Sequence, residues 1–183
     1  MSHRVFDFTM TSAPKANDDV ATPPALYHKL NDIFHFDAYD PCPLYGRGGV
    51  NDGLVDPWPG CVFVNPPYSD IPAWLRKAHK ESERGCTVVM LVPVRTATTY
   101  WRKLVWPRIS VILFITQRVT FPSYPREAPF GLCVLVFDTS DASLTSDAWN
   151  SDALTSKGSE EPFTWAAMFP RCTSAQTHKH NHQ

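Results

Sequence analysis

Residues 62–68 read Val62-Phe63-Val64-Asn65-Pro66-Pro67-Tyr68, and this stretch decides the expected fold. Its first three residues are β-branched or aromatic, which predicts a buried strand. Two consecutive prolines cannot donate to a β-ladder and hold φ near about −65°, so the strand ends there in a rigid turn. An amide, a prolyl carbonyl and an aromatic ring are therefore expected at the C-terminal end of a strand, where open α/β sheets bind ligands.

Apolar periodicity on either side predicts alternating helices and strands. A second helix, capped by Ser69 or Asp70, is expected to end at Gly85. The runs 118–121 and 132–138 are expected to pair as an antiparallel hairpin across a proline-rich loop. The remaining predicted elements are a helix over 25–34, a strand over 35–40, a loop over 41–60, a strand over 86–93, a helix over 98–105 and a strand over 110–116. This order predicts an α/β fold.

Composition limits the class of protein. A chain of 183 residues suggests one domain with tails, and 43% hydrophobic residues can form a core. No apolar run approaches the roughly 20 residues of a membrane span, and the polar N-terminus is not a secretory signal. Five cysteines without regular spacing argue against a disulfide framework. We therefore expect a protein of a host cell's cytoplasm or of a nucleus, neither membrane-bound nor secreted.

Charge is distributed unevenly along the chain. The net charge is only −1, but the segment 71–126 carries ten basic residues opposed by Glu81 and Glu83 alone. A local excess of about +8 can hold phosphates whatever the total charge. The alternative is that several of these side chains form the solvated faces of two helices. The ten basic residues are Arg76, Lys77, Lys80, Arg84, Arg95, Arg102, Lys103, Arg108, Arg118 and Arg126.

The motif 65–68 resembles the catalytic motif of S-adenosylmethionine-dependent amino-methyltransferases. These enzymes methylate adenine N6, cytosine N4 or a protein glutamine amide. An aryl amine is a poor nucleophile because its lone pair is delocalised into the ring. The Asn65 side-chain oxygen and the Pro66 carbonyl would each accept one N–H and draw the amine toward tetrahedral geometry, while Tyr68 would stack on a flipped base. The structural alternative is a strand-to-loop corner stiffened by Pro66 and Pro67.

The chain from about residue 18 to residue 138 is similar to the small phage-type DNA N6-adenine methyltransferases. The landmarks are 21–23, 36–42, 52–54 with Trp58, 65–68, 74–78, 92–96, Trp101, Arg118 with Phe121, and 128–130. The resemblance implies DNA as substrate and a compact or truncated Rossmann-like methyltransferase fold with a mixed sheet and a C-terminal antiparallel hairpin. Residues 1–18 lack periodicity and are expected to form a mobile arm before a methyltransferase domain over 19–138, and the abundance of Asp, Ser and Thr after that domain predicts a partly disordered linker and tail over 139–183. Within that tail, the apolar segment 161–170 can dock on the domain.

The resemblance further implies a site for S-adenosylmethionine. Thr22 and Pro23 would pack on the methionine end of the cofactor. Asp37 or Asp40, with Pro41 beside it, would accept from the amino group or the ribose hydroxyls, as acidic residues after strands do in dinucleotide folds. The pair Asp52-Gly53 is a candidate near the cofactor's adenine, and Asn65 faces the methyl group. For each aspartate the alternative is a turn or cap residue.

Candidate DNA contacts are Arg95, Lys103, Arg118 and Arg126, and no metal site is expected. The chain has no room for an inserted recognition domain, so a homodimer or an accessory subunit is a possible source of sequence recognition. Three alternative acceptors stay open, namely cytosine N4, RNA adenine and protein glutamine, as does a catalytically silent nucleic-acid-binding subunit. The chain departs from the larger methyltransferase fold in one respect, which bears on the alternative of a catalytically silent subunit. Only 24 residues, 41–64, separate Asp40 from Asn65, so two strands of the larger fold are missing or rearranged.

Overall fold

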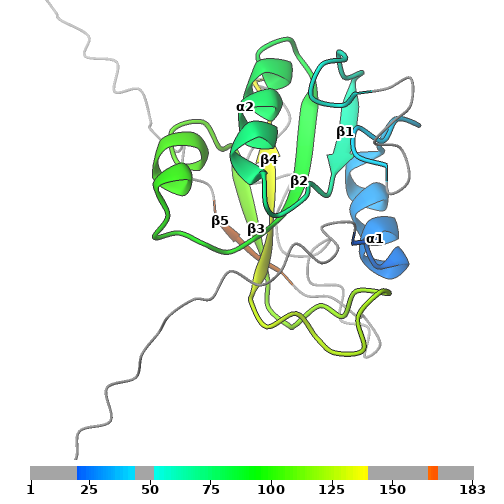
Figure 1. Cartoon of the computed structure of the whole chain (residues 1–183). Helices are drawn as coiled ribbons and strands as arrows, with labels where there is room; N and C mark the ends of the chain where they lie inside the picture. Colours follow the sequence, from blue (N-terminus) through cyan, green and yellow to red (C-terminus); the bar gives the residue numbers. More distant parts are fainter. Residues whose placement is uncertain (1–19, 44–51, 140–164, 169–183) are drawn as a thin grey trace, which may run out of the picture.

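A computed structural model describes residues 20–43, 52–139 and 165–168, in which helices cover both faces of one β-sheet (Figure 1). The helices are α1 (Pro24–Phe34), α2 (Ile71–Ser82) and a single π-helical turn, η1 (Trp101–Val105). The strands are β1 (Cys61–Val64), β2 (Thr87–Pro93), β3 (Val111–Ile115), β4 (Leu132–Phe137) and β5 (Trp165–Met168). The expected α/β class with a mixed sheet is confirmed.

The sheet has the strand order β1-β2-β4-β3-β5. Strand β1 runs parallel to β2, whereas β4 lies between β2 and β3 and is antiparallel to both. Strands β1, β2 and β3 therefore share one direction, and their C-terminal ends lie at the same end of the sheet. Asn65, Val94 and Thr116 directly follow these three strands, and we call this part of the molecule the C-terminal end of the sheet.

The core has two halves, one on each face of the sheet. On the α1 side, Leu26 and Leu30 pack with Phe63 of β1. On the α2–η1 side, Val62 and Val64 pack with residues of α2 and η1. Successive side chains of a strand point to opposite faces, so one short strand supplies both halves of the core. Burial on both faces explains why the strands read as continuous apolar runs rather than as alternating patterns.

Helix α2 forms as its sequence predicts. Ile71, Trp74, Leu75 and Ala78 are spaced at helical intervals and all are buried. Asp70 occupies the N-cap position, although its side chain makes no capping hydrogen bond. After the helix the chain turns at Gly85, whose φ of 92° lies in the left-handed region that favours glycine.

One expected element is wrong. The segment 35–40 forms no strand. His35 takes a left-handed conformation at the end of α1, and the Asp37 N–H donates to Cys61 O (2.8 Å) while Asp37 Oδ2 accepts from Cys61 N (2.7 Å). Cys61 N thus donates to a side-chain oxygen of Asp37 instead of to a backbone carbonyl, and the segment 35–40 forms no β-ladder with β1. The helix expected over 98–105 is present, as helical residues 99–100 followed by the π-turn η1 over 101–105.

The expected pairing of 118–121 with 132–138 is also wrong. Strand β4 pairs with β2 and β3, and the only β-structure in the loop between β3 and β4 is one isolated bridge, Thr120 to Glu127. Prolines at 122, 125 and 129 lack the N–H groups that a longer ladder needs. Val119 and Ala128, joined by a 2.8 Å hydrogen bond, are buried and anchor this loop on the α1 side.

The segments outside the sheet are only partly described. The expected N-terminal arm over 1–18 and most of the expected linker and tail over 139–183 lie outside the described residues. Residues 165–168 form β5 against β3, so docking is confirmed for this described part of the expected segment 161–170. Between Asp40 and Asn65 the described residues contain only strand β1, in keeping with the short spacing. Among the described helices, none has the length and apolar character needed to cross a membrane.

Candidate active site

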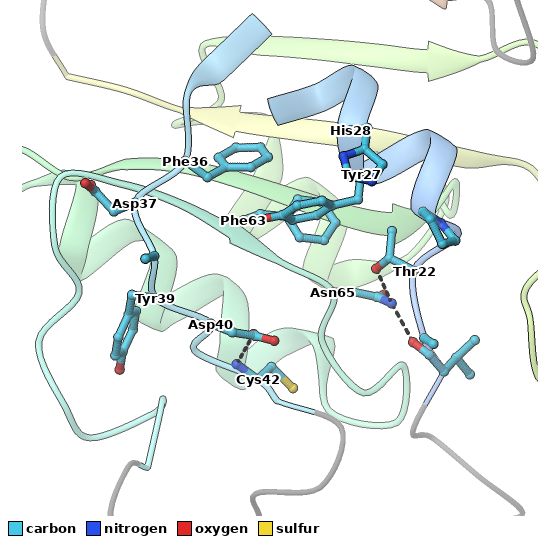
Figure 2. A pocket seen from close by; sticks show the side chains of 14 residues that line it. Thr22, Tyr27, His28, Phe36, Asp37, Tyr39, Asp40, Cys42, Phe63 and Asn65 are labelled. Atoms are coloured by element: carbon cyan, nitrogen blue, oxygen red, sulfur yellow. Dashed lines mark hydrogen bonds between the residues drawn. The ribbon is translucent and has the colours of Figure 1, made fainter. Parts of the chain in front are cut away.

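A cavity of about 510 Å³ lies on the α1 side, next to the C-terminal end of β1 (Figure 2). This volume is within the range of small-molecule sites, about 300–1,000 Å³. Three segments form its wall, namely the residues before and within α1, the segment 36–42 and strand β1 with Asn65. The labelled lining residues are Thr22, Tyr27, His28, Phe36, Asp37, Tyr39, Asp40, Cys42, Phe63 and Asn65.

Asn65 is held in one orientation. Its Nδ2 donates to the carbonyl oxygen of Val20 (2.8 Å) and to Thr22 Oγ1 (3.1 Å), and Figure 2 shows both bonds. These bonds use both N–H donors of the amide. No described residue donates to Oδ1, which is therefore left as an acceptor beside the cavity. The structure thus brings Thr22 and Asn65 together.

Pro23 supports this arrangement from outside the cavity wall. It is buried at the N-cap of α1, and its carbonyl accepts from Tyr27 N (3.0 Å). The chain before α1 is thereby fixed, which places Val20 and Thr22 against Asn65. Pro23 is not among the residues that line the cavity.

Asp37 and Asp40 both line the cavity. Asp37 Oδ2 is bound to Cys61 N, and a Cβ at Gly60 would overlap that oxygen. Asp40 Oδ1 accepts from Cys42 N (2.8 Å) in an Asx turn. Asp40 is therefore both a turn residue and part of the cavity wall. Desolvation raises the pKa of the Asp40 carboxyl, and the bond from Cys42 N opposes this.

Asp52 and Gly53 do not line the cavity. Asp52 Oδ1 accepts from Leu54 N (3.0 Å), which makes it a turn residue. Gly53 lies against Pro41, since a Cβ at Gly53 would overlap the Pro41 carbonyl. The Gly53 carbonyl accepts from Trp58 Nε1 (2.7 Å). This turn therefore supports the segment that carries Asp40.

Pro66, Pro67 and Tyr68 lead from β1 into α2. Both prolines are buried, and the Pro67 carbonyl accepts from Asp70 N (3.0 Å). The Tyr68 ring packs edge-on against Phe130, with centroids 5.9 Å apart, and touches both halves of the core. Its hydroxyl is buried without a hydrogen-bond partner, and burial raises the pKa of this phenol. Tyr68 does not line the cavity, so its stacking on a base stays a prediction.

The four candidate DNA contacts are all exposed. Arg95 follows β2, and Arg118 and Arg126 lie on the loop between β3 and β4, so these three belong to the C-terminal end of the sheet. Arg118 Nη1 lies 3.4 Å from the Ala128 carbonyl, which it uses as an acceptor. Lys103 lies on η1, on the α2–η1 side.

Lys77 was grouped with the exposed basic residues, but it is buried. Its Nζ donates to Glu81 Oε1 (2.7 Å) and to the Asp56 carbonyl (2.6 Å) and lies 5.5 Å from the centroid of the Trp58 ring. Glu81 Oε2 accepts from Trp58 N (3.2 Å), and Arg84 Nη1 lies 3.1 Å from Oε1. Desolvation acts to raise the pKa of Glu81, but these partners outweigh it and lower the pKa.

Sequence reasoning missed this network and the aromatic cavity wall. The spacing of Lys77 and Glu81, four residues apart on a helix with an apolar stripe, was the available signal for the ion pair. Tyr27, Phe36 and Phe63, whose rings lie 5.5–5.7 Å from one another, form the aromatic wall. No local pattern joins these three residues, which come from three segments.

The lining suits S-adenosylmethionine. Aromatic rings can cover an adenine ring, and the carboxylates of Asp37 and Asp40 can accept from an ammonium group or from ribose hydroxyls. Acidic residues also favour a ligand that carries positive charge on sulfur. The described residues contain no cluster of side chains that could hold a metal ion.

Comparison with known proteins identifies the family of the chain. A family model described as DNA N-6-adenine-methyltransferase (Dam) matches residues 10–140. No curated protein and no solved structure matches the chain. The matched range includes every residue that lines the cavity, the motif 65–68 and strands β1 to β4. The chain therefore belongs to the DNA N-6-adenine-methyltransferase (Dam) family, and that family methylates adenine in DNA at N6.

Proposed function

We propose that this chain transfers a methyl group from S-adenosylmethionine to N6 of an adenine flipped out of DNA. One observation carries the proposal. The amide of Asn65 is fixed at the end of β1 with both N–H groups bonded, so that Oδ1 is left to accept beside a cavity of about 510 Å³. An acceptor held in this way can bind an amine N–H without a competing donor.

Asn65 and Pro66 make the amine reactive. Asn65 Oδ1 and the Pro66 carbonyl each accept one N–H of the adenine amino group and direct its lone pair toward the cavity. The cofactor supplies, when bound, an electrophilic methyl group on positively charged sulfur. As the new C–N bond forms, the S–C bond breaks and sulfur keeps its electron pair. The amino nitrogen then loses one proton to water, and Asn65 and Pro66 stabilise the charge while it is present.

The cofactor would be held by the cavity wall. Thr22, Asp37 and Asp40 supply polar contacts, and Pro23 and Pro41 support them through the backbone. Asp52 and Gly53 act on the cofactor indirectly, since their turn lies against Pro41. The strand order β1-β2-β4-β3, with β4 reversed, supports a truncated Rossmann-like methyltransferase sheet.

The DNA would be held at the C-terminal end of the sheet. Tyr68 stacks on the flipped base, as aromatic side chains do in enzymes that extrude a base. Arg95, Arg118 and Arg126 lie at this end and can bind phosphates, with Lys103 as a further contact. Sequence recognition would come from a second copy of the chain or from an accessory subunit. The reducing cytoplasm of a host cell, or a nucleus, is the expected location.

The test is an assay of the methylated product. The full chain is incubated with methyl-tritiated S-adenosylmethionine and unmethylated duplex DNA, and the DNA is then digested to nucleosides and separated. Label in N6-methyldeoxyadenosine, absent with the Asn65→Ala variant, is the expected result. Label in N4-methyldeoxycytidine, in RNA or in protein would overturn the substrate, and no label in any acceptor would overturn the activity.

A further inference from the structure

The solvent-exposed residues of α2 and η1 are all basic. Along α2 only Arg76 and Lys80 are exposed, and along η1 only Arg102 and Lys103. The other residues of these two elements are buried or half-buried. The turns that follow add Arg84 and Arg108 to the same surface.

This surface concentrates the positive charge of the chain. The segment 71–108 has eight basic and two acidic residues, a net charge of +6, whereas the chain as a whole has a net charge of −1. The rest of the chain therefore carries −7. Lys77 and Glu81 are buried and pair with each other, so Glu83 is the one exposed acidic residue in this segment. Buried residues of α2 and η1 belong to the same core cluster, so the exposed basic residues of both elements lie on a single side of the sheet (Figure 1).

Helix α1 and the segment after it, on the opposite side, do not share this charge; the exposed Arg118 and Arg126 on that side belong to the loop between β3 and β4. The exposed residues of α1 are Pro24, Ala25, His28 and Asp32, and the exposed Asp37 and Asp40 follow. A polyanion such as DNA would meet carboxylates there and cations on the α2–η1 side. Charge complementarity therefore favours one side of the molecule for the phosphate backbone.

The spacing of the cations also suits a nucleic acid. Arg76 and Lys80 are four residues apart on α2, so they lie on one face of the helix about 6 Å apart along its axis, and Arg84 follows in the turn after the helix. Helix α2 starts three residues after Tyr68, so these basic residues lead away from the motif 65–68. Phosphates of one DNA strand rise about 3.4 Å each, so Arg76 and Lys80 together span about two of them.

We propose that the α2–η1 side binds the phosphate backbone of the duplex that flanks the target adenine. The inference rests on the proposed function, which makes DNA the polyanion. Arg84 pairs with Glu81 (3.1 Å) and Arg108 lies 3.9 Å from Glu83. The strongest contribution is therefore expected from Arg76, Lys80, Arg102 and Lys103, for which no partner is recorded among the described residues.

The experiment measures how salt affects duplex binding by the full chain. The dissociation constant for a fluorescent duplex of about 30 base pairs is measured by anisotropy over a series of salt concentrations. The triple variant Arg76→Gln/Lys80→Gln/Arg102→Gln should reduce the slope of log K against log salt by about 2 to 3, since each phosphate contact contributes about 0.9. Binding at low salt should weaken by at least about tenfold. Binding of S-adenosylmethionine should not change, which would show that the variant is folded.

A matched pair of single variants controls for net charge. Arg76→Gln and Lys29→Gln each remove one positive charge, but Lys29 lies on α1, on the other side of the sheet. Only Arg76→Gln should lower the slope, by about 1. If the wild type methylates DNA and the triple variant keeps its slope and affinity, the inference is overturned and the proposed function stands. If the wild type binds no duplex and methylates no DNA, both fail, and binding of RNA alone would overturn DNA as the occupant.

Discussion

Polar side chains on the two sides of the sheet differ in how many of their hydrogen-bonding atoms are occupied by other groups of the protein. On the α1 side, Asn65 is fixed through Nδ2 and Asp40 through Oδ1, and Asn65 Oδ1 and Asp40 Oδ2 make no hydrogen bond to a described residue in these two cavity-lining side chains. On the α2–η1 side, both oxygens of Glu81 are occupied, Oε1 by Lys77 and Arg84 and Oε2 by Trp58 N. The first arrangement keeps hydrogen-bonding capacity for a ligand, and the second uses all of it inside the protein.

This difference shows how a small sheet can bind a ligand without losing its core. Phe63 of β1 lines the cavity, whereas its neighbours Val62 and Val64 belong to the core on the other side. Because side chains alternate along a strand, the two functions do not compete for the same positions. We therefore expect substitutions of the cavity residues on the α1 side to reduce activity more than stability, and substitutions of the buried residues on the α2–η1 side to do the reverse.

The largest effect is expected at Asn65 on the α1 side. Asn65→Ala removes the proposed acceptor of the amino group and should lower the rate of methyl transfer by about 10³-fold or more, which is about 4 kcal/mol of transition-state stabilisation. The free energy of unfolding should fall by only about 1 kcal/mol, because the groups left unpaired line an open cavity. Single-turnover rates and urea denaturation measure the two quantities.

Thr22→Ala is the matched control for the orientation of Asn65. It removes one of the two acceptors of Nδ2 but keeps the Val20 carbonyl. The rate should fall by about tenfold, since the amide is less firmly held. An Asn65→Ala enzyme within a few-fold of the wild-type rate would show that the amide is not the acceptor.

The next largest effect is expected at Lys77 on the α2–η1 side. Lys77→Met leaves Glu81 buried with Arg84 as its remaining ionic partner and should lower the free energy of unfolding by about 3 kcal/mol. Arg84→Gln is the matched control. The Arg84 side chain is 54% exposed, so its loss should cost less than about 1 kcal/mol. Equal losses in urea denaturation would mean that burial does not distinguish the two partners of Glu81, and a Lys77→Met protein as stable as the wild type would contradict a stabilising buried ion pair on the α2–η1 side.

Local features of the sequence predicted much of this fold. Prolines at 66 and 67 end β1, and the stripe of Ile71, Trp74 and Ala78 forms α2, because both effects act within a few residues. The position of β4 between β2 and β3 was not predictable in the same way. Strands buried on both faces show no alternation, so nothing local records which strand lies beside which.

The candidate site was predictable to a similar degree. The end of β1 identified Asn65, whereas Asp40 lines the cavity although the strand expected before it does not form. Pattern alone failed at Asp37, whose alternating segment forms no strand because its side chain bonds to β1. Pattern also failed at Lys77. A lysine is expected at the surface, but Lys77 is buried because it pairs with Glu81 one helical turn away. In both cases a single side-chain contact overrides the local pattern.

Tyr68 contacts both halves of the core, so its variants are expected to change both activity and stability. Tyr68→Ala removes the ring proposed to stack on the base and should lower the rate by about 100-fold, with a loss of about 2 kcal/mol in stability. Tyr68→Phe keeps the ring and removes a buried hydroxyl that has no partner. It should keep nearly the full rate and raise stability by up to about 1 kcal/mol. Equal loss of rate in both variants would contradict stacking.

The smallest effect separates the two sides by the sign of their response to acid. The pKa of Glu81 is lowered in the folded state, so its contribution to stability is present above the unfolded value and is lost as pH falls through the folded value. The pKa of Asp40 is raised, so its charged form is disfavoured by folding and its protonation on acidification restores stability. Protonation of Glu81 on the α2–η1 side therefore lowers the free energy of unfolding, whereas protonation of Asp40 on the α1 side raises it.

Two variants without bound cofactor test these signs. Between about pH 7 and pH 4, Glu81→Gln should lose less of its free energy of unfolding than the wild type, because the group that acid would protonate is gone. Asp40→Asn should lose more, because it lacks the group whose protonation offsets the loss. Urea denaturation at the two pH values measures both differences. Deviations in the same direction would mean that Asp40 is not desolvated in the folded protein, and the α1 side would then offer a fully hydrated carboxylate to its ligand.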